Sequence, residues 1–324
     1  MSNNLQIKVC RETNYIFHML SVSMSGYDND YGQMHTGLHS KDDLAVLKKH
    51  ELLITVRGGE HVGMLYWLLV CLPASLNTNT QMLYEFILDV FVNDDPGSHL
   101  EKYSCFWQGL DDNMSSDTVI DFYNRTRINF HNLRSEIIEI CSVMINNYQI
   151  FIDHVWDASE KAISEYANEL QNTFDESEII KQFDELMQRD NDNVLFASLV
   201  NSIHDGAEAI DVSQNKHVFG IGNYPNEFRC IKSQKEFILH EYVIFMLKQR
   251  LDFPDNHESY LKQWKYIESL AAFFKSKILI DTDKCRDDWT PQNIIDFYRE
   301  AYSSNPRISP AELLESALEH FEKG

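Results

Sequence analysis

Residues 237–247 read Phe237-Ile-Leu-His240-Glu241-Tyr-Val-Ile244-Phe-Met-Leu247. The stretch is almost wholly apolar and contains neither Gly nor Pro, so it favours a helix. His240 and Glu241 interrupt it as two adjacent polar residues. Residues four apart lie on one face of a helix, so His240 shares its face with Ile244. The chemistry open to His240 therefore depends on what stands at position 244.

A second apolar stretch follows, Trp264-Lys-Tyr-Ile-Glu268-Ser-Leu-Ala271-Ala-Phe-Phe274, and we expect it to be helical as well. Before both helices, the spacing of apolar residues changes from a helical pattern to one that is typical of strands. Residues 193–200 are rich in β-formers, and residues 208–222 hold turn residues between two short apolar runs, which indicates strands. The last third of the chain is thus predicted as a small sheet followed by two helices, each carrying a polar group.

These features resemble the gluzincin branch of the zinc metallopeptidases. In that branch a His-Glu-x-x-His helix carries two zinc ligands and the general base, and a later helix adds a Glu ligand in a Glu-x-x-Ala context. The resemblance implies that His240 and Glu268 are metal ligands and that Glu241 is the general base. It also implies a zinc-bound water, which the metal makes acidic enough to attack a peptide bond. Residues 121–123 and the helix after them resemble a group of bacterial gluzincin-like proteins.

One position departs from the family pattern. Ile244 stands where the branch has its second His, and an aliphatic side chain has no lone pair for a metal. His240 and Glu268 alone leave a site short of the three protein ligands that catalytic zinc needs. We therefore expect weak zinc binding and impaired catalysis.

A substitute ligand is the alternative. His257, with Glu258 beside it, lies between the two helices in a segment that we expect to be a loop able to fold over the site. His204 and His217, in the β-rich region, are more distant candidates, whereas Gln249 points away from the face of His240. With His257 in place, His240, Glu268 and His257 would form a rearranged metal site.

Composition narrows the class of partner. The chain has 324 residues, of which 44% are hydrophobic, so it can bury a sizeable core. It has 50 Asp and Glu against 28 Lys and Arg, a formal net charge of −22. Such a surface repels nucleic-acid phosphates and anionic membranes. The favoured interpretation of the charge is solubility, and the alternative is a basic peptide substrate or protein partner.

Cysteine use and the N-terminus bear on location. The six cysteines form no Cys-x-x-Cys pair and no regular framework, which is typical of reduced thiols. The N-terminal residues lack the apolar core of a signal peptide. The longest apolar run, residues 62–72, is too short to span a bilayer and reads as a buried helix. We therefore predict a cytoplasmic protein.

Residues 1–190 read as a series of helices, and the fold class is therefore α+β and mostly helical. We predict a helical domain over 1–190 and a gluzincin-like domain over 191–324, in which the small sheet packs on the His240 helix. The expected helices are the following: 11–24, 42–49, 61–72, 80–92, a nearly continuous run over 116–174, 176–187, and two that begin at Thr290-Pro291 and Ser309-Pro310.

Three functions compete. The first is a catalytically impaired gluzincin-like protein that binds a peptide or protein in a cleft beside the His240 helix. The second is an active zinc metallopeptidase with the rearranged ligand set. The third is an unrelated helical interaction protein, for which there is no reason to expect His240 and Glu268 to be adjacent.

Overall fold

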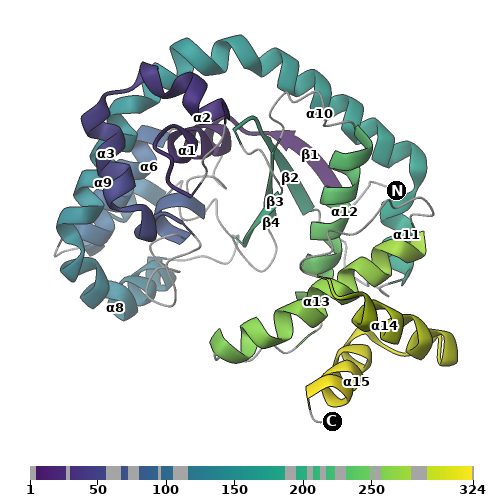
Figure 1. The fold of residues 1–324 in the computed structure, drawn as a ribbon. Coiled ribbons are helices and arrows are strands. Elements are labelled where there is room, and N and C mark those ends of the chain that lie inside the picture. The colour runs from purple at the N-terminus through teal and green to yellow at the C-terminus, as the bar shows by residue number, and fades with distance from the viewer. Residues whose placement is uncertain are drawn as a thin grey trace. The chain divides into compact units, whose positions relative to one another are not determined.

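The computed structural model describes residues 5–26, 30–55, 67–71, 80–93, 96–104, 116–186, 195–202, 207–211, 217–222, 231–248, 251, 257–278 and 290–322. Among these residues helices dominate and one small sheet accompanies them, which confirms the mostly helical α+β class (Figure 1). Among the helices described, none combines the length and the apolar character that crossing a membrane requires.

The chain forms two compact units. The sheet unit comprises Leu5–Asn172 and Asn193–Cys230. The C-terminal unit comprises Thr173–Asp192 and Ile231–Gly324, together with Met1–Asn4. This division differs from the predicted boundary after residue 190, because the strands after residue 193 pair with a strand at the N-terminus. The packing of the sheet on the His240 helix stays a prediction.

The sheet has four strands, in the order β1 (Leu5–Val9), β2 (Leu195–Val200), β4 (His217–Gly222), β3 (Ala207–Asp211). β1 runs parallel to β2, β2 runs parallel to β4, and β3 pairs antiparallel with β4. The predicted strands in 193–200 and 208–222 are therefore confirmed. In β2, Ala197, Leu199 and Val200 are fully buried, as expected of a central strand.

β1 was not expected, because its five residues are few and its partner strand lies far away in the sequence. Helix α10 (Asp157–Ser177) protects its free edge. The carboxamide of Gln171 accepts a hydrogen bond from Ile7 N at 2.7 Å and donates one to Leu5 O at 3.3 Å. One side-chain amide thus bonds the backbone N–H and C=O groups of this edge as a further strand would. Pairing of the edge with another chain is thereby blocked.

Helix α1 (Arg11–Val22) holds the sheet to the helices of its unit. All of its residues from Glu12 to Val22 are buried. The Asn14 amide donates to Leu199 O at 2.8 Å and accepts from Asn201 N at 2.9 Å, which ties α1 to the end of β2. On its other side, the Tyr15 hydroxyl donates to Met144 O on α9 (Arg134–Phe151). The core of the sheet unit therefore lies around α1.

The predicted helices of this region are confirmed where the structure describes them, whereas residues 61–66 and 72 of the expected 61–72 helix lie outside the described residues. Besides α1, α9 and α10, the helices are the following: α2 Asp30–His35, η1 Thr36–Leu38, α3 Lys41–Lys49, η2 Glu51–Leu53, η4 Trp67–Cys71, α6 Thr80–Phe86, η5 Ile87–Val92, η6 Pro96–Ser98, η7 Glu101–Tyr103, α8 Ser116–Asn132 and η8 Ile152–Trp156.

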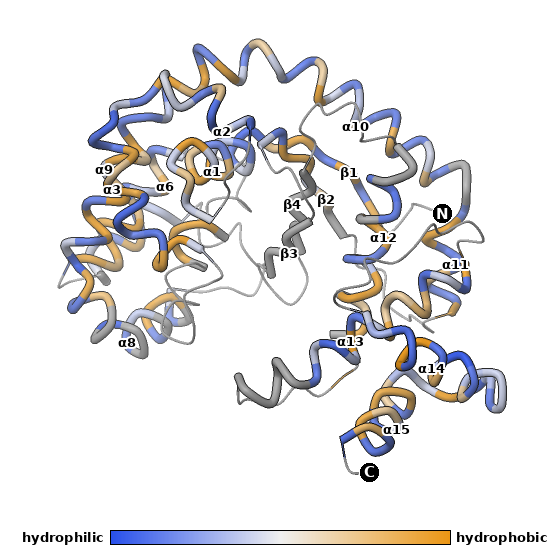
Figure 2. The backbone as a smooth tube through the Cα atoms, viewed as in Figure 1, coloured by the Kyte–Doolittle hydropathy of each residue, from blue (hydrophilic) through white to orange (hydrophobic). Residues whose placement is uncertain are grey.

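The C-terminal unit is built of helices, namely α11 (Ile179–Leu186), α12 (Ile231–Lys248), α13 (His257–Ile278), α14 (Gln292–Ser304) and α15 (Pro310–Glu322). Hydrophobic and hydrophilic segments alternate along α14 and α15 (Figure 2). α15 begins as predicted, because Ser309 and Glu312 cap each other's backbone N–H groups. α14 begins one residue later than predicted, with Pro291 at the cap in place of Thr290.

Candidate functional site in the C-terminal unit

The His240 stretch forms helix α12, as its apolar sequence predicts. Ile238, Leu239, Val243 and Leu247 are fully buried, and they point in several directions around the helix axis. A helix that is apolar on most sides is buried on most sides. Its position is also fixed by a polar contact, since the Tyr242 hydroxyl donates a hydrogen bond to Asp184 of α11. His240 therefore projects from a rigid support.

Glu268 lies in α13, between buried neighbours. Ile267 and Leu270 are fully buried, and the Ser269 hydroxyl is satisfied within the helix by Lys265 O at 2.7 Å. α13 packs directly against α12. Lys275 and Lys277 stand in its last turn, where cations stabilise the helix dipole. The carboxylate of Glu268 is thus carried by a second well-packed helix.

The structure brings the two predicted ligands together. His240 Nε2 lies 2.8 Å from Glu268 Oε2, and the side chains are only 20% and 17% exposed. A carboxylate can only accept a hydrogen bond, so His240 Nε2 carries the hydrogen and donates it. The bond is charge-assisted and mostly shielded from water, which makes it stronger than an ordinary surface pair.

The third position of the expected set is apolar. Ile244, one helical turn after His240, is 3% exposed and offers no donor atom. Two ligands of a tetrahedral zinc ion lie about 3.4 Å apart, given usual metal–ligand distances. The pair at 2.8 Å would need to open only slightly to admit a metal, yet it supplies two of three ligands. The predicted general base, Glu241, follows His240 in α12 and is partly exposed.

The expected substitute ligand lies elsewhere than predicted. His257 is the first residue of α13 rather than part of a loop. It precedes Glu268 by eleven positions of the same helix, which is about 16 Å along the axis. Two positions that far apart on one straight helix cannot ligate the same ion, because zinc–ligand bonds are only about 2 Å long.

The structure describes only one of the other sequence candidates. His217 is the first residue of β4, and His204 and Gln249 lie outside the described residues. Within the part of the chain that the structure describes, no three His, Cys, Asp or Glu side chains are grouped so that they could hold a metal ion.

Comparison of the chain with protein-family models, with curated proteins and with solved structures finds no match. The gluzincin resemblance therefore rests on the residues of α12 and α13 and on the contact between them.

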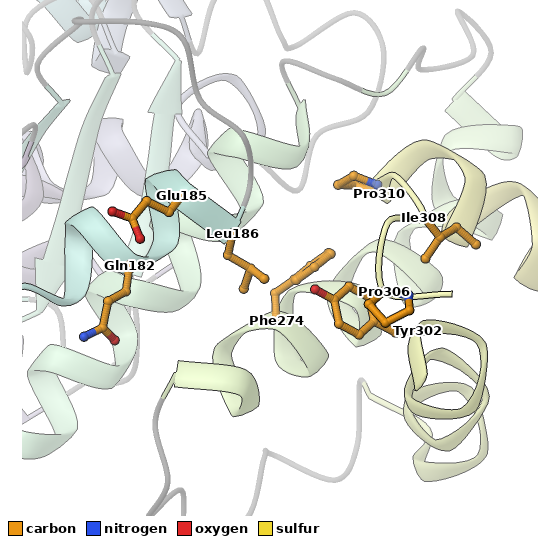
Figure 3. A pocket seen from close by; sticks show the side chains of 8 residues that line it. All are labelled: Gln182, Glu185, Leu186, Phe274, Tyr302, Pro306, Ile308 and Pro310. Carbon is orange, nitrogen blue, oxygen red and sulfur yellow. The ribbon is translucent and has the colours of Figure 1, made fainter. Parts of the chain in front are cut away.

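The C-terminal unit also contains a pocket of about 410 Å³, within the usual size range of ligand sites. Figure 3 shows residues of α11 on one side, Phe274 of α13 at the base, and residues from the end of α14 to the start of α15 on the other side. The lining mixes apolar and aromatic side chains with polar groups, and a carboxylate and an amide lie on the α11 side. It consists of Gln182, Glu185, Leu186, Phe274, Tyr302, Pro306, Ile308 and Pro310.

Nothing in the residue spacing singles out this pocket, because its lining comes from three separate stretches of the chain. A second feature is also absent from the sequence-based predictions, namely a buried polar cluster around His18 and His39 in the sheet unit. Two features of the sequence could have indicated this cluster. His18 stands at the centre of the apolar helix α1, and His35 and His39 are four residues apart. Such signals indicate a buried polar network without specifying its partners.

Proposed function

We propose that this chain is a gluzincin-like metallopeptidase homologue that binds a peptide or protein segment without cleaving it. The observation that carries the proposal is the contact between His240 and Glu268, which joins the two helices in the register that the resemblance implies. Ile244 leaves the set one ligand short, so the site is poorly equipped to activate a water molecule.

The alternatives fit these residues less well. A working peptidase needs a third ligand, and the position of His257 in α13 places it too far from Glu268. An unrelated helical protein has no need for a His and a Glu to meet from two helices. Zinc binding by Ile244→His would distinguish a gluzincin-like site from a buried polar pair of purely structural origin.

The pocket beside α13 provides a place for the bound segment. It begins at Phe274, six positions and about 9 Å along α13 from Glu268. Tyr302 and Phe274 form an aromatic surface that suits an apolar side chain. Glu185, which is exposed at the pocket, suits a neighbouring Lys or Arg. We therefore propose a ligand with an apolar residue next to a basic one.

The charge of the chain supports the same class of ligand. A net charge of −22 attracts basic segments over a distance and disfavours nucleic acids and anionic lipids. The proposed setting is the cytoplasm, where the six cysteines stay reduced.

The proposal is tested by selecting peptides from a random phage-displayed library on the purified full chain. We expect enrichment of sequences that pair an apolar with a basic residue, and we expect the selected peptide to bind without being cleaved. Glu185→Lys should weaken that binding at least tenfold. Glu315→Lys makes the same charge change at an exposed position of α15 and should leave affinity within twofold.

Three results would oppose this function. Selection of acidic peptides, or equal loss of affinity in both variants, would mean that the peptide does not bind in this pocket. Hydrolysis of the selected peptide that a chelator abolishes would establish the active metallopeptidase in its place.

A further inference from the structure

A continuous chain of hydrogen bonds crosses the sheet unit. The Tyr31 hydroxyl of α2 lies 2.8 Å from His18 Nδ1 of α1, and His18 Nε2 lies 2.8 Å from His39 Nε2. His39 Nδ1 in turn lies 2.8 Å from Asn147 Oδ1 of α9. The Asn147 amide continues to Asp43 Oδ2 of α3 at 2.9 Å. Four helices are therefore joined through two imidazole rings.

The partners fix the direction of every bond. Asn147 Nδ2 faces two acceptors, Asp43 Oδ2 and Val143 O, so its amide nitrogen must point there and its oxygen toward His39. His39 Nδ1 therefore carries a hydrogen, and in the neutral ring Nε2 is the acceptor. It follows that His18 donates through Nε2 and accepts at Nδ1 from Tyr31. With both rings neutral, each hydrogen bond of the chain is satisfied.

The chain is sealed from water. His18 is fully buried, Tyr31 is 5% exposed and His39 is 6% exposed. Burial lowers the pKa of His18 well below its ordinary value, and the nearby His39 and His35 lower it further. Burial also lowers the pKa of His39, although Asn147 and Asp43 oppose this shift.

Two other titratable neighbours, His35 and Asp43, affect protonation of the chain in opposite directions. His35 is half-buried, and its ring centroid lies 5.8 Å from that of His18 and 4.6 Å from that of Tyr31. Its own pKa is lowered by burial and by His39, so a proton on His35 adds positive charge beside the chain. Asp43 is the acidic group at the far end, where it favours a proton on His39.

Acid disrupts this arrangement in two steps. A first proton can bind His18 Nδ1 if the Tyr31 hydroxyl turns to accept a hydrogen bond from it. It can instead bind His39 Nε2 if His18 also changes tautomer. In either case a charge is left in the interior. A second proton would place hydrogens on both Nε2 atoms, which face each other at 2.8 Å. No acceptor then lies between them, so the doubly protonated chain must part.

The segment that would move is short. Residues 30–39 carry Tyr31, His35 and His39, and two further contacts hold the segment to α1. Gly32 lies so close to α1 that an added Cβ would be 2.3 Å from Ser21 O. The Thr36 hydroxyl donates to Val22 O at 3.1 Å. On its outer side the segment presents Met34, which is 66% exposed, to solvent.

We propose that His18 and His39 form an acid-sensitive latch that closes residues 30–39 over α1 and α9 at neutral pH and releases them when both rings are protonated. The device is independent of the peptide-binding function and lies wholly within the sheet unit.

The latch predicts a steep pH dependence of local opening. Two histidines that are buried in the neutral form contribute their full stabilisation above the pKa of about 6.5 that they have in the unfolded state. This stabilisation is lost as the pH falls below that value. Between about pH 7.5 and pH 5.5 the opening equilibrium should rise about a hundredfold, or about tenfold for each histidine. Amide hydrogen exchange of residues 30–39, corrected for intrinsic rates, measures this opening in the full-length protein.

A matched pair of variants tests whether the two imidazole rings cause this pH dependence. His39→Gln keeps one donor and one acceptor but cannot titrate, so the rise should shrink to about tenfold. His154→Gln removes an exposed His of the same unit and should leave the hundredfold rise intact. An unchanged rise in His39→Gln, or no pH dependence in the wild type, would overturn the proposal.

If His39→Gln fails to fold, nuclear magnetic resonance of the wild type tests the proposal instead. At about pH 7.5 the ¹⁵N spectrum should report His18 as the Nε2–H tautomer and His39 as the Nδ1–H tautomer. The pKa of each ring should lie below the ordinary value of about 6.5. Either ring in the opposite tautomer, or a pKa above that value for both, would contradict the latch.

Discussion

His240 Nε2 and Glu268 Oε2 lie 2.8 Å apart and connect α12 to α13 in the C-terminal unit. Both side chains are about four-fifths shielded from solvent, and each comes from a helix with buried neighbours. A zinc peptidase of the gluzincin type would interpose a metal between such groups. Here they satisfy each other, and Ile244 occupies the position that would complete the set.

Breaking this pair should destabilise the C-terminal unit. Glu268→Ala leaves a largely buried imidazole N–H without its acceptor, and we expect a loss of about 1–3 kcal/mol of unfolding free energy. Glu268→Gln keeps an acceptor oxygen and should lose less. Urea unfolding of the two variants beside the wild type measures the difference. Equal stability of all three proteins would mean that the hydrogen bond contributes nothing.

Gly32 should tolerate no side chain. An added Cβ would lie 2.3 Å from the Ser21 carbonyl oxygen, which belongs to the backbone of α1 and cannot move cheaply. We expect Gly32→Ala to cost about 1–3 kcal/mol, in the range of overpacked cores. Gly37 has no atom within 4 Å of the same added carbon, so Gly37→Ala is the matched control and should be neutral or slightly stabilising. Thermal unfolding of both variants tests the contact, and a stable Gly32→Ala would refute it.

The start of α15 should depend on pH. Glu312 accepts hydrogen bonds from the Ser309 N–H and hydroxyl, each at 2.8 Å, and these bonds lower the pKa of its carboxyl. Because the folded pKa is lowered, the stabilisation is present above the unfolded pKa of about 4.3 and is lost as pH falls through the folded value. Carboxyl titration by nuclear magnetic resonance should give a pKa for Glu312 below the ordinary Glu value of about 4.3. In Ser309→Ala the pKa of Glu312 should rise toward that ordinary value, and a pKa that stays low would assign the shift to another cause.

The local features of the fold follow well from sequence. Ser309-Pro310 marks the start of α15 because a hydroxyl cap and a Pro at the first helical position are local requirements. The strands in 193–200 and 208–222 are likewise signalled by short apolar runs between turn residues. Helix starts, helix faces and hairpins depend on neighbours within a few residues, so one sequence contains their signals.

Long-range partners do not follow in the same way. β1 pairs with β2 across almost two hundred residues, and that pairing moves the strands out of the predicted C-terminal domain. His257 reads as a loop residue because α13 begins earlier than its apolar stripe. The contact of His240 with Glu268 is foreseeable only because a family resemblance gives the spacing of its two helices a meaning.

The most direct test of the account is the zinc content of four purified proteins, measured by elemental mass spectrometry. These are the wild type, Glu268→Ala, Ile244→His, and the double variant with both changes. With an incomplete ligand set, the wild type should contain little zinc. Ile244→His should contain one zinc per chain, because a His one turn after His240 restores the third ligand. The double variant should lose that zinc. One zinc per wild-type chain that disappears in Glu268→Ala would contradict the proposal of an incomplete site. A folded Ile244→His without zinc would contradict the gluzincin-like geometry itself.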